Sequence, residues 1–358
     1  MTERRPGHPA RARSALWATL TVAAIWLTAV IPAGAQTITL QTAAGGATVS
    51  GTNPSWLTGF GNVNGLGAGT PGTGVSLITS GVSGGVLYYT PYRIVVSSNG
   101  ATVRAYVSTN FAHPTVLTLS SCYPAASCTT AASFTTLSTN LIAPTLIASG
   151  LAAGTYTAAL GQFVSSVNGA SAYSGADTAT VTLFTYSSGG LLSDIDTLRL
   201  NTPSTNVQTA VRLLLSAAGG VAVTPASDFA ASFGSVNGLG IGPAAGLTVA
   251  AATGGVVYRT PYAITTTFAG FSSTTATLKA HVSTDFAHPA VLEMRDSPDN
   301  SAFTAISKVP ASPTTISSTA ASGSALTRYL GMFVSTLNGA GAFTGSDNVV
   351  LTYTVLVP

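Results

Sequence analysis

The feature that most constrains this chain is an internal repeat, in which four short blocks recur in the same order about 170 to 175 residues later. Residues 60–67 return as 233–240, 84–92 as 254–262, 107–114 as 282–289 and 161–170 as 331–340. Four collinear matches are typical of a duplicated fold and not of chance. The sequence therefore predicts two divergent copies of one domain.

The limits of the domains follow from where the matches end. We expect copy one at 36–186, copy two at 211–358, and a linker at 187–210 that opens with two serines and two glycines. A further strand at 194–200, inside this linker, is an alternative that the sequence leaves open.

Each copy reads as short strands separated by turns. Residues 178–186 alternate apolar and polar side chains, as a strand with one buried face does, and 349–357 are their counterpart. Further strands are expected in copy one at 75–79, 86–89, 93–96, 102–108, 115–120, 134–137 and 155–163. No segment has the apolar spacing of a long amphipathic helix. We predict an all-β chain of two tandem antiparallel β-sandwiches, Ig-like or jelly-roll-like.

The first 35 residues read as a secretory signal peptide. Arginines precede an uncharged apolar run at 15–31, and Pro32-Ala33-Gly34-Ala35 supplies the small residues for cleavage after Ala35. The run is also about the minimum length for a spanning helix, so an uncleaved anchor is the alternative. We expect export to the periplasm, the cell surface or the medium, with no membrane span after cleavage.

Cleavage would leave a neutral protein. Four of the 13 Lys and Arg residues and one of the ten Asp and Glu residues lie in the leader, so nine of each sign remain in 323 residues. A neutral surface offers neither the counterion release that drives nucleic-acid binding nor attraction to anionic lipid. We therefore expect no nucleic-acid partner. A surface rich in Ser and Thr also gives little electrostatic protection against self-association.

Cys122 and Cys128 are expected to form a disulfide at a hairpin tip, because an exported protein meets an oxidising compartment. Five intervening residues fit neither a C-x-x-C redox pair nor zinc-knuckle spacing, and no histidine lies nearby. Copy two has a strand, a polar turn at 296–300 and a second strand at the same place. This replacement favours a structural role for the thiols.

Two glycine motifs suggest chemistry that their context does not support. Residues 81–85 match the G-x-S-x-G nucleophile elbow, but a strand-like run follows, and copy two carries Thr253 in place of Ser83. Residues 67–72 match the dinucleotide pattern G-x-G-x-x-G, but no βαβ unit surrounds them. We interpret both motifs as loops.

Each copy carries a histidine and an aspartate at matching places. His113 and His288 follow Phe-Ala and precede proline; we expect rings that bond backbone, with metal ligation or proton transfer as the alternative. Asp177 and Asp347 come just before the last strand of each copy; we expect turn caps, with calcium ligation as the alternative. Because no clustered ligands or Ser/His/Asp set emerges, we predict no catalytic residue, no cofactor and no metal site.

The tyrosines of the second block are candidates for stacking on a sugar or another ligand. They are Tyr88, Tyr89, Tyr92, Tyr258 and Tyr262, and copy two carries Arg259 in place of Tyr89. Burial in the core is the alternative reading for one or two of them.

The end of each copy resembles the closing strand of secreted bacterial surface and fimbrial-type sandwich domains. Residues 172–183 and 342–351 carry this resemblance, with the pattern G-x-Y-x-D/G-x-V-x-V. The resemblance implies a β-sandwich exposed at a cell surface, and it assigns no functional residues.

The leading hypothesis is therefore a non-enzymatic exported protein, structural or adhesive, that self-assembles through sheet edges or contacts other surface proteins and glycans. The alternatives are an extracellular carbohydrate- or ligand-binding module and a secreted hydrolase with an unrecognised site. The copies differ at the cysteine loop, at Tyr89 against Arg259 and at Asn110 against Asp285. Specific recognition is expected first at these differing loops.

Overall fold

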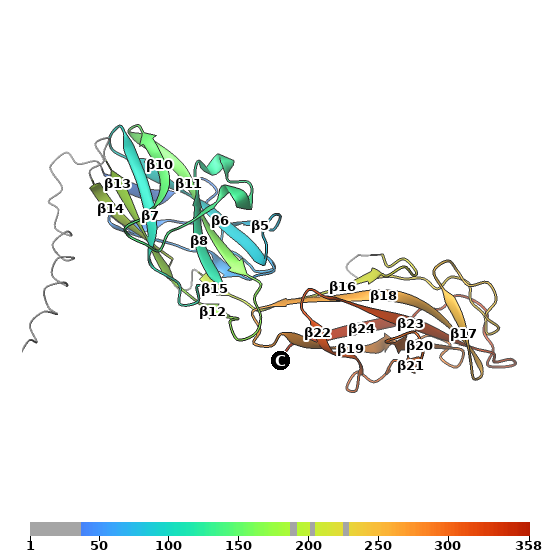
Figure 1. Cartoon of the computed structure of the whole chain (residues 1–358). Helices are drawn as coiled ribbons and strands as arrows, with labels where there is room; N and C mark the ends of the chain where they lie inside the picture. Colours follow the sequence, from blue (N-terminus) through green and yellow to red (C-terminus); the bar gives the residue numbers. More distant parts are fainter. Residues whose placement is uncertain (1–36, 187–191, 201–204, 225–228) are drawn as a thin grey trace, which may run out of the picture.

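The computed structural model describes residues 37–186, 192–200, 205–224 and 229–358. They form a chain of β-strands in two lobes placed end to end (Figure 1). The predicted all-β sandwich class is confirmed. The expected signal peptide at 1–35 lies outside the described residues, and within them no helix is long and apolar enough to cross a membrane.

Sandwich one, the lobe from residue 37 to residue 207, packs two sheets face to face. The first sheet has the order β1 (Ile38–Thr42), β6 (Gly85–Val96), β11 (Gly154–Ser165), β8 (Leu117–Cys122) and β9 (Thr135–Thr136), with β5 (Ser76–Ile78) also paired to β6. The second has the order β10 (Thr145–Leu151), β7 (Ala101–Thr109), β13 (Ala179–Tyr186), β14 (Leu192–Leu200), β3 (Ser55–Thr58) and β2 (Ser50–Thr52). A small sheet of β12 (Gly175–Ala176), β15 (Thr205–Val207) and β4 (Gly61–Val63) lies at the end nearer the second lobe.

Sandwich two, from residue 210 to residue 358, follows the same plan with fewer strands among its described residues. Its first sheet has the order β16 (Ala210–Ala217), β18 (Gly255–Ala269), β23 (Ala325–Ser335), β20 (Leu292–Ser297) and β21 (Thr304–Ala305), with β17 (Thr248–Ala252) also paired to β18. Its second sheet has the order β22 (Thr314–Ala321), β19 (Thr275–Thr284) and β24 (Val350–Leu356). The first sheets of the two lobes thus match strand for strand, whereas the second sheets do not.

Alternating burial shows why these segments are strands. Along β7 every second residue from Ala101 to Val107 is buried, and β19 repeats this pattern from Ala276 to Val282. Side chains of successive strand residues point to opposite faces, so one face of each strand enters the space between the sheets. The apolar cores of both lobes lie in that space.

A proline lies in the middle of a long strand in each lobe. We predicted separate strands at 86–89 and 93–96, but they are one strand, β6, that passes through Pro91. One edge of β6 pairs with β5 up to Tyr89 and with β1 from Tyr92 onward, so Pro91 lies where the partner changes. Pro261 has the same place in β18, between β17 and β16. A residue without an N–H is tolerated there because that edge needs no ladder bond.

The segment between the two expected domains contains strands. Residues 192–200, which overlap the strand left open at 194–200, form β14 and pair antiparallel with β13. The other edge of β14 pairs in parallel with β3. Leu198 is 1% exposed and belongs to the core. This part of the expected linker is therefore an inner strand of sandwich one.

Candidate functional site

The first repeated block forms an Asn-Gly turn that is held by a buried tyrosine. Asn64 Oδ1 accepts hydrogen bonds from the N–H groups of Leu66 and Ala68, both at 3.0 Å. The Tyr88 hydroxyl bonds both the N–H and the C=O of Asn64, each at 3.2 Å. Burial is the main cause of the raised pKa of Tyr88. The repeated Tyr and Asn therefore serve as internal supports.

The second lobe builds the same turn at Asn237. The Tyr258 hydroxyl lies 3.0 Å from both the N–H and the C=O of Asn237. Asn237 Oδ1 in turn accepts the N–H groups of Leu239 and Ile241. Both lobes thus use an internal hydroxyl to satisfy backbone groups that the turn leaves unpaired.

Four of the five tyrosines that we considered for stacking on a ligand are buried. Tyr88 and Tyr258 are 0% exposed, and Tyr92 and Tyr262 are 4% and 5% exposed. A buried ring offers no face to an external ligand, so these four are core residues. Tyr89 is half-buried and packs against Phe134 with ring centroids 5.6 Å apart, beside the cysteine loop.

His113 and Asp177 lie together, although the sequence suggested separate roles for them. One carboxylate oxygen of Asp177, Oδ1, accepts the N–H of Ala112, and the other, Oδ2, accepts the N–H of His113, both at 3.1 Å. Oδ2 also lies 3.0 Å from His113 Nδ1. The imidazole stacks on Tyr173 with ring centroids 3.5 Å apart. We call this arrangement the first His–Asp clamp; it ties the loop after β7 to the loop before β13.

The second His–Asp clamp has the same geometry. Asp347 accepts the N–H groups of Ala287 and His288 at 3.0 and 2.9 Å and lies 3.0 Å from His288 Nδ1, while the ring stacks on Phe343. Burial tends to raise the pKa of Asp347. The hydrogen bonds from Ala287, the His288 side chain and Asn348 outweigh this and lower it to about 2. The aspartates bond the backbone of these loops, as turn caps do. The prediction that the histidine rings bond backbone is wrong, because each ring nitrogen lies against the carboxylate of its aspartate.

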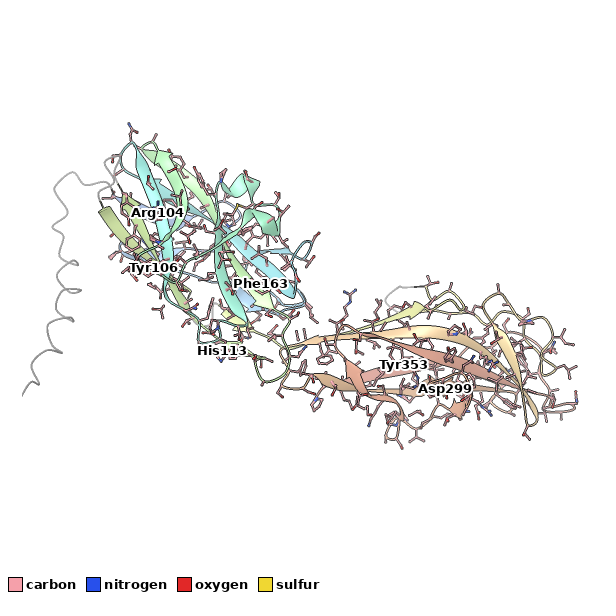
Figure 2. The ribbon with its side chains drawn as sticks, in the orientation of Figure 1. Arg104, Tyr106, His113, Phe163, Asp299 and Tyr353 are labelled. Atoms are coloured by element: carbon pink, nitrogen blue, oxygen red, sulfur yellow. A yellow bond between two sulfur atoms is a disulfide. The ribbon has the colours of Figure 1, made fainter. Side chains whose placement is uncertain are left out.

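The clamps resemble the acid–base pair of a catalytic triad only in part. The His113 side chain is 42% exposed and lies at the end of sandwich one that faces sandwich two (Figure 2). Both oxygens of each aspartate accept backbone N–H groups, which fixes the loops. Among the described residues no group of three or more His, Cys, Asp or Glu residues is placed to hold a metal ion.

A hollow of about 400 Å³ lies beside the first clamp. Apolar side chains and side chains with a hydroxyl or amide contribute equally to its lining, which includes Val107, Asn110, Pro114, Leu137, Ser138 and Thr139. In sandwich two the residues matching Asn110 and Thr139 are Asp285 and Lys308, which form an ion pair at 2.6 Å. One of the predicted differences between the copies, Asn110 against Asp285, therefore lies at this hollow.

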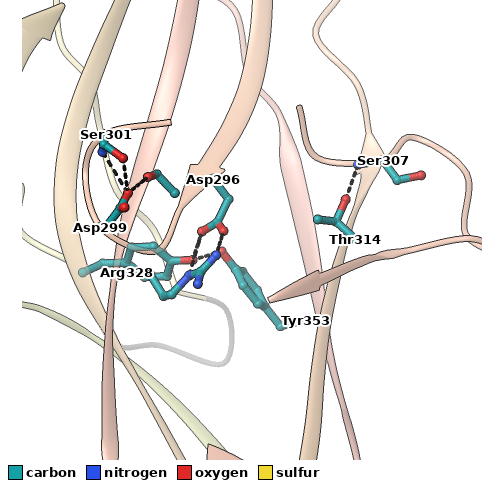
Figure 3. Close-up of polar contacts among 9 residues, drawn as sticks. Asp296, Asp299, Ser301, Ser307, Thr314, Arg328 and Tyr353 are labelled. Atoms are coloured by element: carbon teal, nitrogen blue, oxygen red, sulfur yellow. Dashed lines mark hydrogen bonds and ion pairs between the residues drawn. The ribbon is translucent and has the colours of Figure 1, made fainter. Parts of the chain in front are cut away.

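Sandwich two has a buried charged cluster that sequence reasoning missed. Arg328 on β23 forms an ion pair with Asp296 on β20 (Figure 3), and both residues are under 10% exposed. The Tyr262 hydroxyl lies 3.3 Å from Asp296 Oδ1 and 2.9 Å from the Tyr353 hydroxyl. Burial is the main cause of the raised pKa values of both tyrosines.

The strand registers identify the sandwich-one counterparts of this cluster. Asp296 matches Ser121, Arg328 matches Ala158 and Tyr353 matches Leu183, while Tyr262 matches Tyr92. We predicted a polar turn at 296–300, but Asp296 lies inside β20. Two charges next to apolar runs in a chain with only 6% charged residues were the available signal. The cluster belongs to the interior of sandwich two and has no counterpart charge in sandwich one.

The cysteine loop is a staple, as predicted. Cys122 and Cys128 form a disulfide, and both residues are 5% exposed or less. Cys122 ends β8, and β9 follows the loop and pairs with β8. The bond therefore closes the tip of this hairpin.

The two lobes meet through the fourth repeated block of sandwich one. Asn168 Nδ2 donates to the C=O of Phe268 at 2.8 Å, and the N–H of Gly169 donates to the C=O of Phe271 at 2.9 Å. The N–H of Gly270 donates to the C=O of Val167 at 3.3 Å. All three partners in sandwich two belong to the β18–β19 hairpin, so the lobes are joined by direct hydrogen bonds as well as by the chain.

No protein-family model matches this chain, and no curated protein sequence matches it. Among solved structures, the N-terminal domain of PorA gives a TM-score of 0.24 at 9% identity, covering 48% of this chain and 98% of that one. A chaperone–tip adhesin complex of CFA/I fimbriae gives 0.23 at 10% identity, covering 91% and 92%. CfaE, the adhesive subunit of the CFA/I fimbria of enterotoxigenic Escherichia coli, gives 0.17 at 11%, covering 90% and 92%. Fimbrial adhesins are thus weak structural neighbours, and similarity of this degree carries no argument about function.

Proposed function

We propose that this chain is a non-enzymatic exported protein that acts as a structural or adhesive component at the cell surface. The observation that supports this proposal most is that the polar side chains repeated in both lobes form hydrogen bonds within the chain. The Tyr–Asn turns and the His–Asp clamps direct their hydrogen bonds to the chain's own backbone. Polar groups that are committed to fixing loops are typical of a scaffold.

The arrangement of the lobes supports the same proposal. Two sandwiches lie end to end with a hydrogen-bonded junction (Figure 1). An elongated molecule holds its two ends far apart, as a spacer or an adhesive subunit must. The disulfide suits an oxidising compartment outside the cytoplasm.

The test is localisation together with adhesion. The full chain is expressed in cells, and the N-terminus of the product, its surface accessibility to protease and the adhesion of cells to one another and to a solid support are measured. Cleavage after Ala35, surface exposure and loss of adhesion on deletion of the gene are expected. Retention in the cytoplasm, or deletion without effect on adhesion, would contradict the proposal.

Ligand binding is a second candidate, favoured by the hollow beside the first clamp. Asn110→Asp with Thr139→Lys introduces the residues that form the ion pair in sandwich two. If the hollow binds a sugar, the wild type should give signals on a glycan array that this double variant loses. Thr319→Lys on the exposed edge of β22 is the control for added charge. Silence of the wild-type protein on the array would remove this candidate.

A further inference from the structure

Among the described residues, the second sheet of sandwich two has three strands, whereas that of sandwich one has six. In sandwich one, β13 lies between β7 and β14. Its counterpart β24 pairs with β19 on one side and has no partner on the other among the described residues. Beyond β14, sandwich one has the β2–β3 hairpin; at the matching place in the sequence, the described residues of sandwich two form an isolated bridge between Thr224 and Ala230. An open position for one strand, which we call the β14 slot, therefore adjoins β24.

Residues that β14 covers in sandwich one are partly exposed in sandwich two. Ile38 and Leu40 on β1 are 0% exposed, whereas their counterparts Leu213 and Leu215 on β16 are only half-buried. The core of sandwich one is therefore covered at β14, whereas the core of sandwich two is partly exposed at the same place.

The inward face of β24 shows the same loss of cover. Val181 and Leu183 of β13 are 2% and 1% exposed, whereas Leu351 and Tyr353 of β24 are only partly buried. The slot is thus lined by apolar side chains from β16 on one sheet and from β24 on the other.

The edge of β24 also lacks the usual protection against pairing. Its sequence, Val-Leu-Thr-Tyr-Thr-Val-Leu, contains no charged residue and no proline. Val350 and Leu356 are 51% and 48% exposed. Natural edge strands are normally short, charged or interrupted, because a bare edge is a template for another strand.

We propose that the β14 slot is filled by β24 of a second copy of this chain, paired antiparallel across a two-fold axis. This inference deepens the self-association in the proposed function and rests on it for its biological context. An antiparallel neighbour is what β14 is to β13 in sandwich one. The two-fold axis makes each β24 donor and acceptor at once, so one contact completes both lobes.

The chemistry of the edge favours a second copy over an unrelated strand. Because β24 carries no charge, two copies meet without like-charge repulsion. Pairing also joins two three-stranded sheets into a six-stranded sheet, the number found in the second sheet of sandwich one. The apolar inward faces of both β24 strands then turn toward the two cores, as the pleat requires.

The experiment measures the mass of the purified mature protein by sedimentation velocity over a range of concentrations. The wild type is expected to be a dimer. Thr352→Lys, at an exposed position of β24, places two positive charges near each other at the axis and should raise the dimer dissociation constant about tenfold or more. Thr315→Lys on β22, the opposite edge of the same sheet, is the matched control and should remain a dimer.

Thermal melts establish that each variant is folded, and Thr354→Lys repeats the test at a second exposed position of β24. A wild type that is monomeric at every concentration overturns the inference, as does a dimer that both β24 variants leave intact. The adhesion assay distinguishes this inference from the proposed function. If the protein is monomeric and still supports adhesion, only the inference of a β24 dimer is contradicted. If the β24 dimer forms but supports no adhesion, only the proposed surface role is contradicted.

Discussion

At the scale of single residues, the two lobes place different side chains at the same positions of the core. Sandwich one places Ser121, Ala158 and Leu183 where sandwich two places Asp296, Arg328 and Tyr353. A buried ion pair loses hydration that its mutual attraction only partly restores, so it is weak evidence for stability. Removing one partner is far more harmful, because the other charge is left buried and unpaired.

Asp296→Ala alone should destabilise sandwich two by about 3–5 kcal/mol, since Arg328 then has no counterion. The variant Asp296→Ser, Arg328→Ala, Tyr353→Leu, which copies sandwich one, should be much closer to the wild type. Urea unfolding of both proteins measures the difference. If the triple variant were as unstable as the single one, the unpaired charge would not be the cause.

The second clamp predicts a stability that depends on acid pH. The pKa of Asp347 is lowered to about 2 in the folded protein from an ordinary 3.8. Stability from this carboxylate is therefore fully present above about pH 4 and is lost as the pH falls toward 2. Melting curves should show Asp347→Asn below the wild type at pH 6, with a gap that closes near pH 2. A gap that does not change with pH would contradict this assignment.

At the scale of strands and turns, periodicity and repetition predicted much of the fold. The closing strands expected at 178–186 and 349–357 are β13 and β24 within a residue at each end, because both alternate clearly. The continuity of β6 through Pro91 was missed, since it depends on which neighbours the strand has. The pairing of Asp177 with His113 was missed as well, because 64 residues separate them and only the fold brings them together.

The Asn-Gly turns should depend on a single hydroxyl group. Tyr88→Phe keeps the ring but leaves the N–H and C=O of Asn64 buried without their partner. A loss of about 1–3 kcal/mol in the unfolding free energy of sandwich one is expected. Phe111→Tyr, which adds a hydroxyl to a buried ring elsewhere in the same core, tests the opposite change. If Tyr88→Phe and the wild type unfold with the same urea midpoint, the turn does not need this hydroxyl group.

The disulfide should stabilise one hairpin and one lobe. Replacing both Cys122 and Cys128 by serine should cost about 2 kcal/mol, because the chain-entropy contribution of so short a loop is small. Calorimetry should show the loss in the transition of sandwich one. An equal loss in sandwich two, whose hairpin at this place has a polar turn, would be evidence against a local staple.

At the scale of the whole molecule, the fourth repeated block makes different contacts in the two lobes. In sandwich one, Asn168 bonds the hairpin of the next lobe. In sandwich two, Asn338 makes a local bond to the C=O of Thr336 and is exposed. The sequence showed that this block is repeated, but not that it connects the lobes. The contact depends on a hairpin that is longer in sandwich two than in sandwich one.

Asn168→Ala should uncouple the lobes while leaving each one folded. Its side chain supplies the 2.8 Å bond to Phe268, and about 1 kcal/mol of coupling is expected to be lost. Calorimetry should show two transitions further apart than in the wild type, and small-angle scattering a broader distribution of lengths. Asn338→Ala is the matched control and should change neither measurement.

The same junction has a mechanical consequence. Within sandwich one, β6 and β11 are zipped together over 12 residue pairs, and β18 and β23 over 11 in sandwich two. The junction has a few hydrogen bonds between the loop after β11 and the β18–β19 hairpin. Tension applied along the molecule is shared by many bonds inside a lobe and by few between lobes, so the junction yields first. The protein would then act as a hinge that gives under load and reseats when the load is removed, with both sandwiches intact.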